Sequence, residues 1–312
     1  AVVSVAQAPA WAGAAGVLGG AIVAVRLHWS LRLMGLPLLL PVLLWQAPQV
    51  PVGQFELLAA DIGQGNAVLV RTAHHALLYD AGPRFSRESD AGHRVLVPML
   101  RALDVRLDTL VLSHRDSDHT GGAEAVLLMQ PQAQLVSSIE EDNVLQTLRP
   151  AIRCVAGQRW LWDGVDFEVL HPQPEDYGPT RKTNAMSCVL RISNGQTSAL
   201  LAGDIEQAQE AALVAHGAQL RADVLLVPHH GSKTSSSAIF LDAVAPRLAL
   251  LQVGYRNRFG HPAEMVRARY QERHIKVLDL PRCGAIGWQS VRPQESSCQR
   301  QMLARYWHHR VP

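Results

Sequence analysis

The sequence predicts an α+β or layered α/β domain from about residue 51 onward. Short hydrophobic runs bounded by turn residues alternate with segments of helical periodicity, which is the pattern of sheets packed against helices. The hairpin-like strands come first along the chain, and strand–helix units follow them. Hydrophobic residues make up 48% of the 312 residues, so a sizeable buried core is possible.

The first 50 residues differ in composition from the rest. Residues 10–25 and 33–45 are almost wholly apolar, and Arg26, His28 and Arg32 lie between the two runs. A bilayer core requires about 20 apolar residues in a helix. We therefore predict a transmembrane helical hairpin over residues 1–46, with a buried soluble hairpin as the alternative. The positive-inside rule places Arg26 and Arg32 in the cytoplasm and the chain after this hairpin outside it.

A proline-containing linker over residues 47–54 leads to the main domain, which we expect over residues 55–290, with a tail at 291–312. Because the chain begins at Ala1, we expect it to be a piece of a longer protein. The strands are predicted at 55–60, 67–72, 76–79, 109–112, 134–137, 166–170, 188–192, 198–201, 224–227, 248–252 and 276–279. The helices are predicted at 93–102, 124–129, 205–216, 237–244 and 263–273.

Charge restricts the function only weakly. The formal net charge is +2, which neither requires nor excludes a nucleic-acid partner. Three lysines stand among 29 basic residues, so the rest are arginines, whose planar guanidinium suits bidentate contact with phosphate. Genomic base composition is the simpler explanation for that bias.

The four cysteines lack the tight spacing of a zinc ribbon. Their even number permits two disulfides, which fit an oxidising compartment, and buried free thiols are the alternative. We favour the pairs Cys154–Cys188 and Cys283–Cys298, although four cysteines allow three pairings.

The stretch TLVLSHRDSDHTGG, at residues 109–122, is the most informative part of the chain. Its hydrophobic strand ends at Leu112, and four potential metal ligands follow within six residues. Nitrogen and carboxylate ligands together suit Zn²⁺ or Mn²⁺. The sequence therefore predicts a site for two divalent ions, whose candidate ligands are His114, Asp116, Asp118 and His119.

Further acidic and histidine residues stand where other hydrophobic strands end. Asp61 and Asp80 follow two early strands, Asp204 follows SALLAG, and His229 and His230 follow VLLVP. Sites in α/β folds lie at converging strand ends. Each aspartate alone is more often a turn or helix cap, but together they predict one site.

These residues resemble the metallo-β-lactamase superfamily, whose HxHxDH loop appears here as HRDSDH. The order of LAADIGQGNA, LLYDAG, SHRDSDHTGG, FEVLHP, LLAGDIE, VPHHGSKTSS and NRFGHP is similar to that of the ComEC family, the DNA-internalisation proteins of natural competence. The resemblance implies a four-layer αβ/βα sandwich with metals at one edge of the two sheets. It also implies that residues 1–50 are the end of a membrane channel segment.

The resemblance implies a ligand set. His114 and Asp116 would bind one metal with Asn184 or His171. Asp118, His119 and either His229 or His230 would bind the other, and Asp204 would bridge them. Asp61 and Asp80 would contact the metal ligands and hold them in orientation, without binding a metal themselves. Asp116 stands where the superfamily usually has histidine, and a carboxylate there favours Mn²⁺.

Two segments are candidates for substrate contact. Ser232, Lys233 and Thr234 follow the histidine pair and precede a helix whose start would suit a phosphate, with a plain capping loop as the alternative. Arg256, Arg258 and His261 lie in the NRFGHP region, where surface arginines are the simpler explanation. We assign Asp118, His229 and His230 to catalysis.

The sequence as a whole predicts a metal-dependent phosphodiesterase acting on incoming DNA. The resemblance implies an inner-membrane protein with this domain on the periplasmic side, beside a channel of the same polypeptide and other competence uptake proteins. It implies degradation of the strand that is not transported. The alternatives are a catalytically weak DNA-guiding module and a hydrolase of another phosphodiester.

Overall fold

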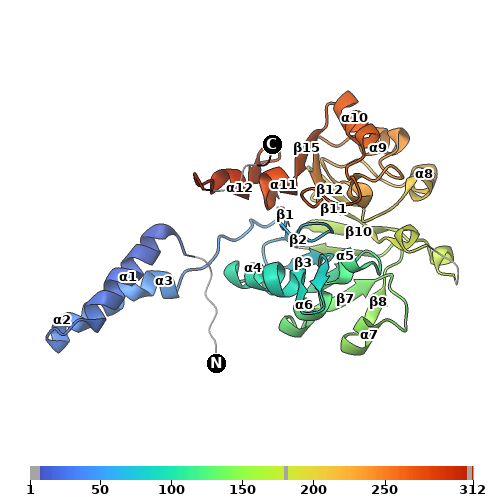
Figure 1. Cartoon of the computed structure of the whole chain (residues 1–312). Coiled ribbons are helices and arrows are strands. Elements are labelled where there is room, and N and C mark those ends of the chain that lie inside the picture. Colours follow the sequence, from blue (N-terminus) through green and yellow to red (C-terminus); the bar gives the residue numbers. More distant parts are fainter. Residues whose placement is uncertain (1–7, 179–181, 308–310, 312) are drawn as a thin grey trace. The chain divides into compact units, whose positions relative to one another are not determined.

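The computed structural model describes residues 8–178, 182–307 and 311. Residues 1–7 of the expected hairpin, and 308–310 and 312 of the expected tail, lie outside the described residues. The chain divides into two compact units, one of residues 1–49 with 97–106 and the other of residues 50–96 with 107–312. Each is considered by itself (Figure 1).

The first unit is helical. The helix that contains Gly19 packs closely against the start of the helix that follows Gly35. A Cβ atom added to Gly19 would lie 2.6 Å from the carbonyl oxygen of Gly35, so only glycine fits there. Within the described residues, none of the helices combines the length and apolar character that crossing a membrane requires. The helices of this unit are α1 (Ala10–Ala24), α2 (Trp29–Leu33), α3 (Leu36–Leu43) and α4 (Val97–Ala102).

The second unit contains an eight-stranded sheet in the order β17-β16-β1-β2-β3-β6-β7-β8. Strands β1, β2 and β3 pair in antiparallel hairpins, whereas β3, β6, β7 and β8 run parallel to one another. Its strands are β1 (Glu56–Ala59), β2 (Val68–Arg71), β3 (Ala76–Tyr79), β6 (Thr109–Leu112), β7 (Gln134–Ser137), β8 (Ala151–Arg153), β16 (Ile286–Gln289) and β17 (Ser296–Cys298).

A seven-stranded sheet follows the order β15-β14-β13-β12-β11-β10-β9, and β12 to β15 run parallel within it. A short hairpin stands apart from both sheets, made of β4 (Arg84–Ser86) and β5 (Ser89–Asp90). The strands of the second sheet are β9 (Arg159–Trp162), β10 (Val165–His171), β11 (Val189–Ser193), β12 (Ser198–Leu201), β13 (Val224–Leu226), β14 (Leu248–Leu251) and β15 (Lys276–Asp279).

The helices lie along the outer faces of the sheets, with α6 and α7 beside the first and α8, α9 and α10 beside the second (Figure 1). The helices of this unit are η1 (Gly92–Leu96), α5 (Ser117–Thr120), α6 (Ala123–Met129), α7 (Val144–Leu148), η2 (Pro174–Asp176), η3 (Asn184–Met186), α8 (Gln207–Ala215), η4 (Pro228–Gly231), α9 (Ala238–Val244), α10 (Glu264–Glu272), α11 (Leu280–Cys283) and α12 (Gln299–Met302).

The buried residues show this layering on both faces of the second sheet. Along β12, Ala199 and Leu201 belong to the core between the two sheets, while Leu200 belongs to the core between the second sheet and α8, α9 and α10. Neighbouring residues of a strand point to opposite faces, so burial on both faces requires a continuous hydrophobic run. The predicted αβ/βα sandwich is confirmed.

The predicted elements are largely present, with differences at the edges. The expected helix at 93–102 is divided between η1 and α4, which lie in different units. The expected boundary at residue 290 falls inside the first sheet, since β17 pairs with β16. Both favoured disulfides, Cys154–Cys188 and Cys283–Cys298, are confirmed.

Candidate metal centre

The site forms where strands of both sheets end. Asp80 follows β3 and His114 follows β6 in the first sheet, whereas Asp204 follows β12 and His230 follows β13 in the second. β3 and β6 run parallel, as do β12 and β13, so within each sheet the residues that follow the two strands emerge at one edge.

Two groups of potential ligands meet there. His114, His119 and Asp204 form one, and Asp118, His119 and His230 form the other, with the ligand atoms of each group within 4.8 Å of one another. The Nε2 atom of His230 is 3.4 Å from Asp118 Oδ2 and 3.5 Å from Asp204 Oδ2. Asp204 therefore lies between the two groups, as expected for a bridging carboxylate.

Each histidine of the site is held by its other ring nitrogen. His119 Nδ1 is 2.8 Å from Asp80 Oδ2, and His230 Nδ1 is 2.8 Å from the carbonyl oxygen of Gln252. His114 Nδ1 is 3.0 Å from the hydroxyl of Ser113. Such partners fix the ring orientation and direct Nε2 toward a metal.

The donor set fits divalent cations. Among the residues that the structure describes, the buried Nε2 atoms of His114, His119 and His230 and the buried Oδ1 of Asp204 have no hydrogen-bond partner. An unpaired buried polar atom is costly, and binding a metal would remove that cost. These residues would hold the divalent ions that the fold implies.

The electrostatics of the site keep its carboxylates ionised. Burial alone would raise the pKa of Asp118, but the nearby imidazoles of His230 and His119 outweigh it and lower the pKa to about 2. Burial would also raise the pKa of Asp204. The positive charges of His119 and His230 outweigh that effect and hold the pKa well below its usual range. Both carboxylates are therefore available to cations near neutral pH.

The backbone at the site is constrained. Asp80, His229 and His230 all have positive φ angles, of 60°, 48° and 52°, a region that costs a non-glycine residue of order 1 kcal/mol. Gly65, with φ 131°, allows the loop after β1 to approach the metal-binding loop, since a Cβ there would lie 2.2 Å from the carbonyl oxygen of Asp118.

The remaining predicted ligands have different surroundings. Asp116 Oδ2 is 3.5 Å from His114 Nε2, which keeps it within reach of the first group. Asn184 Nδ2 is 3.3 Å from His229 Nε2. His171 Nε2 instead lies 3.4 Å from Asp176 Oδ2, and within the described chain it is in neither ligand group.

His229 is the outer histidine of the pair. Its Nε2 atom is 3.8 Å from Asp204 Oδ2 and its Nδ1 atom 3.7 Å from Glu206 Oε1. Burial lowers its pKa, against the charge of Asp204. His230 is the histidine that completes the second group, while His229 faces the open side with its side chain 20% exposed.

The phosphate-binding role predicted for the start of the next helix is not supported. The backbone amides of Ser236 and Ser237, at the start of α9, donate to the carboxylate of Glu210, at 2.5 and 2.7 Å. An internal anion therefore already occupies this helix start. Lys233 is exposed, and the hydroxyl groups of Ser232 and Thr234 lie 3.1 Å apart.

Asp61 and Asp80, both expected behind the ligands, differ in their partners. Asp80 contacts His119, as described above, and accepts from the backbone amide of Ser113 at 2.6 Å. Asp61 instead pairs with Arg300, with 2.6 Å between Nη2 and Oδ2. The structure therefore gives an orienting contact to Asp80 and a surface ion pair to Asp61.

Sequence reasoning missed two serines that join the site. The Ser113 hydroxyl contacts Asp80 at 2.9 Å as well as His114. The Ser187 hydroxyl accepts from the amide of Asp204 at 3.0 Å and lies 3.4 Å from His114 Nδ1. The position of Ser113, directly before the ligand loop, is a usable signal, but nothing in the sequence marks Ser187.

The site is accessible from one side through a cavity of about 760 Å³ that His114 lines together with Arg115, Arg153 and Tyr177. A second cavity, of about 750 Å³, is bordered by His261, whose ring centroid is 6.0 Å from that of His229. The arrangement of buried nitrogen and carboxylate donors beside open space is that of a metallo-hydrolase.

Residues 60–254 match the model of the metallo-beta-lactamase superfamily, and the chain belongs to that superfamily. A solved metallo-beta-lactamase fold protein, YhfI from Bacillus subtilis, shares the fold, with a TM-score of 0.50, 13% identity, and coverage of 76% of this chain and 99% of that one.

Two curated relatives show which family within this superfamily the chain belongs to. The chain is 38% identical to Competence protein ComA of Neisseria gonorrhoeae over 83% of its own length and 36% of the relative's. It is 34% identical to ComE operon protein 3 of Bacillus subtilis over 72% of its length and 32% of the relative's. The chain carries the metallo-β-lactamase domain of the ComEC family, and spans about a third of the length of these relatives.

Proposed function

We propose that this domain is a metal-dependent phosphodiesterase that cleaves DNA during its uptake into the cell. The observation that carries the proposal is the pair of ligand groups that share His119, with buried donor atoms that have no hydrogen-bond partner among the described residues. The names of the competence relatives support DNA as the substrate.

The ligands divide between two ions. His114 and Asp116 would hold one, while Asp118, His119 and His230 would hold the other, and Asp204 would bridge them. Two bound Mn²⁺ or Zn²⁺ ions would supply a hydroxide near neutral pH and positive charge for the phosphoryl oxygens. The carboxylate of Asp116 favours Mn²⁺.

The chain's own groups position the substrate. His229 faces the open side of the site, where its ring can donate a hydrogen bond to a phosphate oxygen or to the leaving oxygen. Asp80 keeps His119 in the orientation and tautomer that a metal requires. Arg256, Arg258 and His261 would contact the backbone of the strand.

The proposed setting is the inner membrane. The domain would lie on the periplasmic side, beside a channel of the same polypeptide and together with other uptake proteins, and would degrade the strand that is not transported. The disulfides Cys154–Cys188 and Cys283–Cys298 support an oxidising compartment.

A second candidate is a DNA-guiding module with a weak metal site. It is favoured by the small donor set of the first ion, because Asn184 lies beside His229 and His171 beside Asp176, so neither adds a donor to His114 and Asp116. A guide need not bind metal stoichiometrically, so metal content separates the two candidates.

The test incubates the whole chain, under oxidising conditions, with end-labelled single- and double-stranded DNA and Mn²⁺, Zn²⁺ or Mg²⁺. We expect cleavage with Mn²⁺, and about two metal ions per chain by elemental analysis. The control Asp118→Ala/His119→Ala should lose at least about 100-fold in rate, because it removes two donors of one ion.

An Asp61→Asn variant should cleave as the wild type does, since Asp61 pairs with Arg300 and, among the described residues, is in neither ligand group. A folded wild-type chain that binds metal and cleaves no DNA with any of the three ions would refute the phosphodiesterase. DNA binding without stoichiometric metal would favour the guiding module.

A further inference from the structure

The segment between β14 and α10 carries exposed aromatic side chains paired with arginines. We call residues 254–261 the aromatic loop. Tyr255 and Phe259 are 43% and 53% exposed. The guanidinium of Arg256 lies 5.2 Å from the ring centroid of Tyr255, and that of Arg258 lies 4.9 Å from the ring of Phe259. The loop thus presents flat apolar faces next to positive charge.

This loop leads to the metal centre. The rings of Phe259 and His261 are stacked, with centroids 5.8 Å apart and planes inclined by 15°. His261 in turn lies 6.0 Å from His229, the outer histidine of the site. A continuous row of rings therefore runs from the exposed end of the loop to the place where a phosphodiester would be cleaved.

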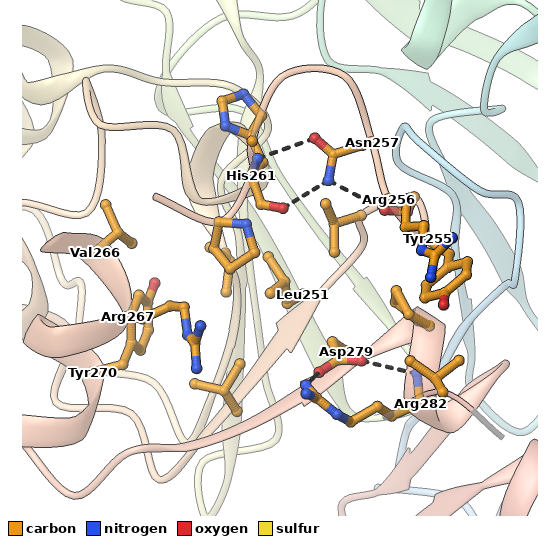
Figure 2. Close-up of a pocket in the computed structure, with 18 of the residues that line it drawn as sticks. Leu251, Tyr255, Arg256, Asn257, His261, Val266, Arg267, Tyr270, Asp279 and Arg282 are labelled. Carbon is orange, nitrogen blue, oxygen red and sulfur yellow. Dashed lines mark hydrogen bonds and ion pairs between the residues drawn. The ribbon is translucent and has the colours of Figure 1, made fainter. Parts of the chain in front are cut away.

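The conformation of the loop is fixed from inside. The side-chain oxygen of Asn257 accepts from the backbone amides of Phe259 and His261, at 3.2 and 3.0 Å. Its amide nitrogen donates to the carbonyl oxygens of Gly254 and His261, at 3.2 and 2.7 Å. Figure 2 shows Asn257 and His261 facing each other across the loop. A prearranged loop loses little entropy on binding a ligand.

Behind the loop is the cavity of about 750 Å³, which Tyr255 and His261 help to line (Figure 2). Leu251, Val266 and Tyr270 contribute apolar and aromatic surface to it, Arg267 contributes a guanidinium, and Arg282 is paired with Asp279 at 2.8 Å in its wall. A cavity of this size and mixed lining suits a planar heterocycle.

We propose that the aromatic loop and the cavity behind it bind a base of single-stranded DNA, next to the phosphodiester at the metal centre. The inference rests on the proposed function. Stacking on an aromatic ring requires a base with a free face, and arginines supply the charge that the adjoining phosphate needs. The bases of a duplex are stacked on one another, so the site selects an unpaired strand.

Binding, and not cleavage, tests the proposal. The whole chain is titrated in the presence of a chelator against a fluorescein-labelled 12-mer of thymidine, and fluorescence anisotropy gives the Kd. We expect Phe259→Ala to weaken binding about five- to tenfold, and Phe259→Trp to bind as the wild type does. A 12-mer without bases should bind wild type and Phe259→Ala equally, because it has nothing to stack.

The charge control is Arg221→Ala, because Arg221 is exposed and precedes β13, at the end of the sheet opposite the metal centre. Arg221→Ala should leave the Kd unchanged, whereas Arg258→Ala should weaken binding of both the thymidine and the abasic strand. A blunt duplex should be insensitive to Phe259→Ala.

Unchanged thymidine binding by a folded Phe259→Ala variant would overturn the proposal, as would equal losses for the strands with and without bases. These outcomes are separate from the fate of the proposed function. A wild type that cleaves DNA while Phe259→Ala binds normally removes only the base site. A wild type that never cleaves, but binds through Phe259, retains the base site and loses the phosphodiesterase.

Discussion

Asp80 illustrates how a residue outside the ligand set can control the site. Its carboxylate is fully buried and reaches His119 as well as both the amide and the hydroxyl group of Ser113. It is thus the central acceptor of a small network that orients His119. Replacing Asp80 should therefore change the affinity for the metal, and not the chemistry of bond cleavage.

We expect Asp80→Asn to weaken metal binding about 10- to 100-fold, because its single acceptor oxygen is needed by the Ser113 amide and its NH2 group then faces His119 Nδ1, which favours the tautomer with a proton on Nε2. Isothermal titration with Mn²⁺ and Zn²⁺ measures the change. Asp61→Asn is the matched control, an aspartate that follows another strand but pairs with Arg300. Equal losses in both variants would contradict the role assigned to Asp80.

At the scale of elements, the start of β11 joins the two sheets beside the site. The amide of Cys188 donates to the carbonyl oxygen of Ser113 at 2.8 Å, and the Cys188 carbonyl oxygen accepts from the hydroxyl of Tyr79 at 2.5 Å. The disulfide to Cys154, which follows β8, ties this segment to the first sheet. The neighbouring Ser187 contacts both Asp204 and His114, so this disulfide bears on the metal centre.

Replacing both Cys154 and Cys188 by alanine should lower the free energy of unfolding by about 2–4 kcal/mol, measured by urea denaturation. It should also weaken metal binding, because Ser187 loses its anchor. Replacing both Cys283 and Cys298 should destabilise the fold by a similar amount and leave metal affinity unchanged. If both pairs had the same effect on metal affinity, the proposed link through Ser187 would be wrong.

At the scale of the whole domain, a polar contact connects the two sheets far from the site. Asp163, in the turn between β9 and β10, accepts from the Thr72 hydroxyl at 2.6 Å and from the His74 amide at 2.8 Å, in the turn between β2 and β3. Burial would raise the pKa of Asp163, but these hydrogen bonds outweigh it and lower the pKa to about 2. The ionised carboxylate thus stabilises the sandwich.

Because the folded pKa of Asp163 lies below its unfolded value, its contribution is present above about pH 4 and is lost as the pH falls toward 2. We expect Asp163→Asn to cost about 1 kcal/mol at pH 6, with roughly half of that difference gone by pH 3. Urea denaturation at a series of pH values measures it. The exposed Asp166 supplies the control, since Asp166→Asn should change the stability little.

Much of the fold could be predicted because its strands are buried on both faces and therefore read as continuous hydrophobic runs. β3, β6, β7 and β12 have the predicted bounds. The strands that were missed are edge or half-exposed ones, such as β8 and β17, which carry fewer hydrophobic residues. Their membership in a sheet depends on a partner distant in the chain, which periodicity does not reveal.

The sequence by itself determined the layered fold and the positions of the ligands at strand ends, because hydrophobic periodicity and ligand spacing are local properties of the chain. Only the tertiary structure decided that His230 completes the second ligand group, that Asp61 pairs with Arg300, and that Glu210 occupies the start of α9. These outcomes depend on side chains from distant segments competing for one partner at distances of a few ångströms, and spacing along the chain carries no record of that competition.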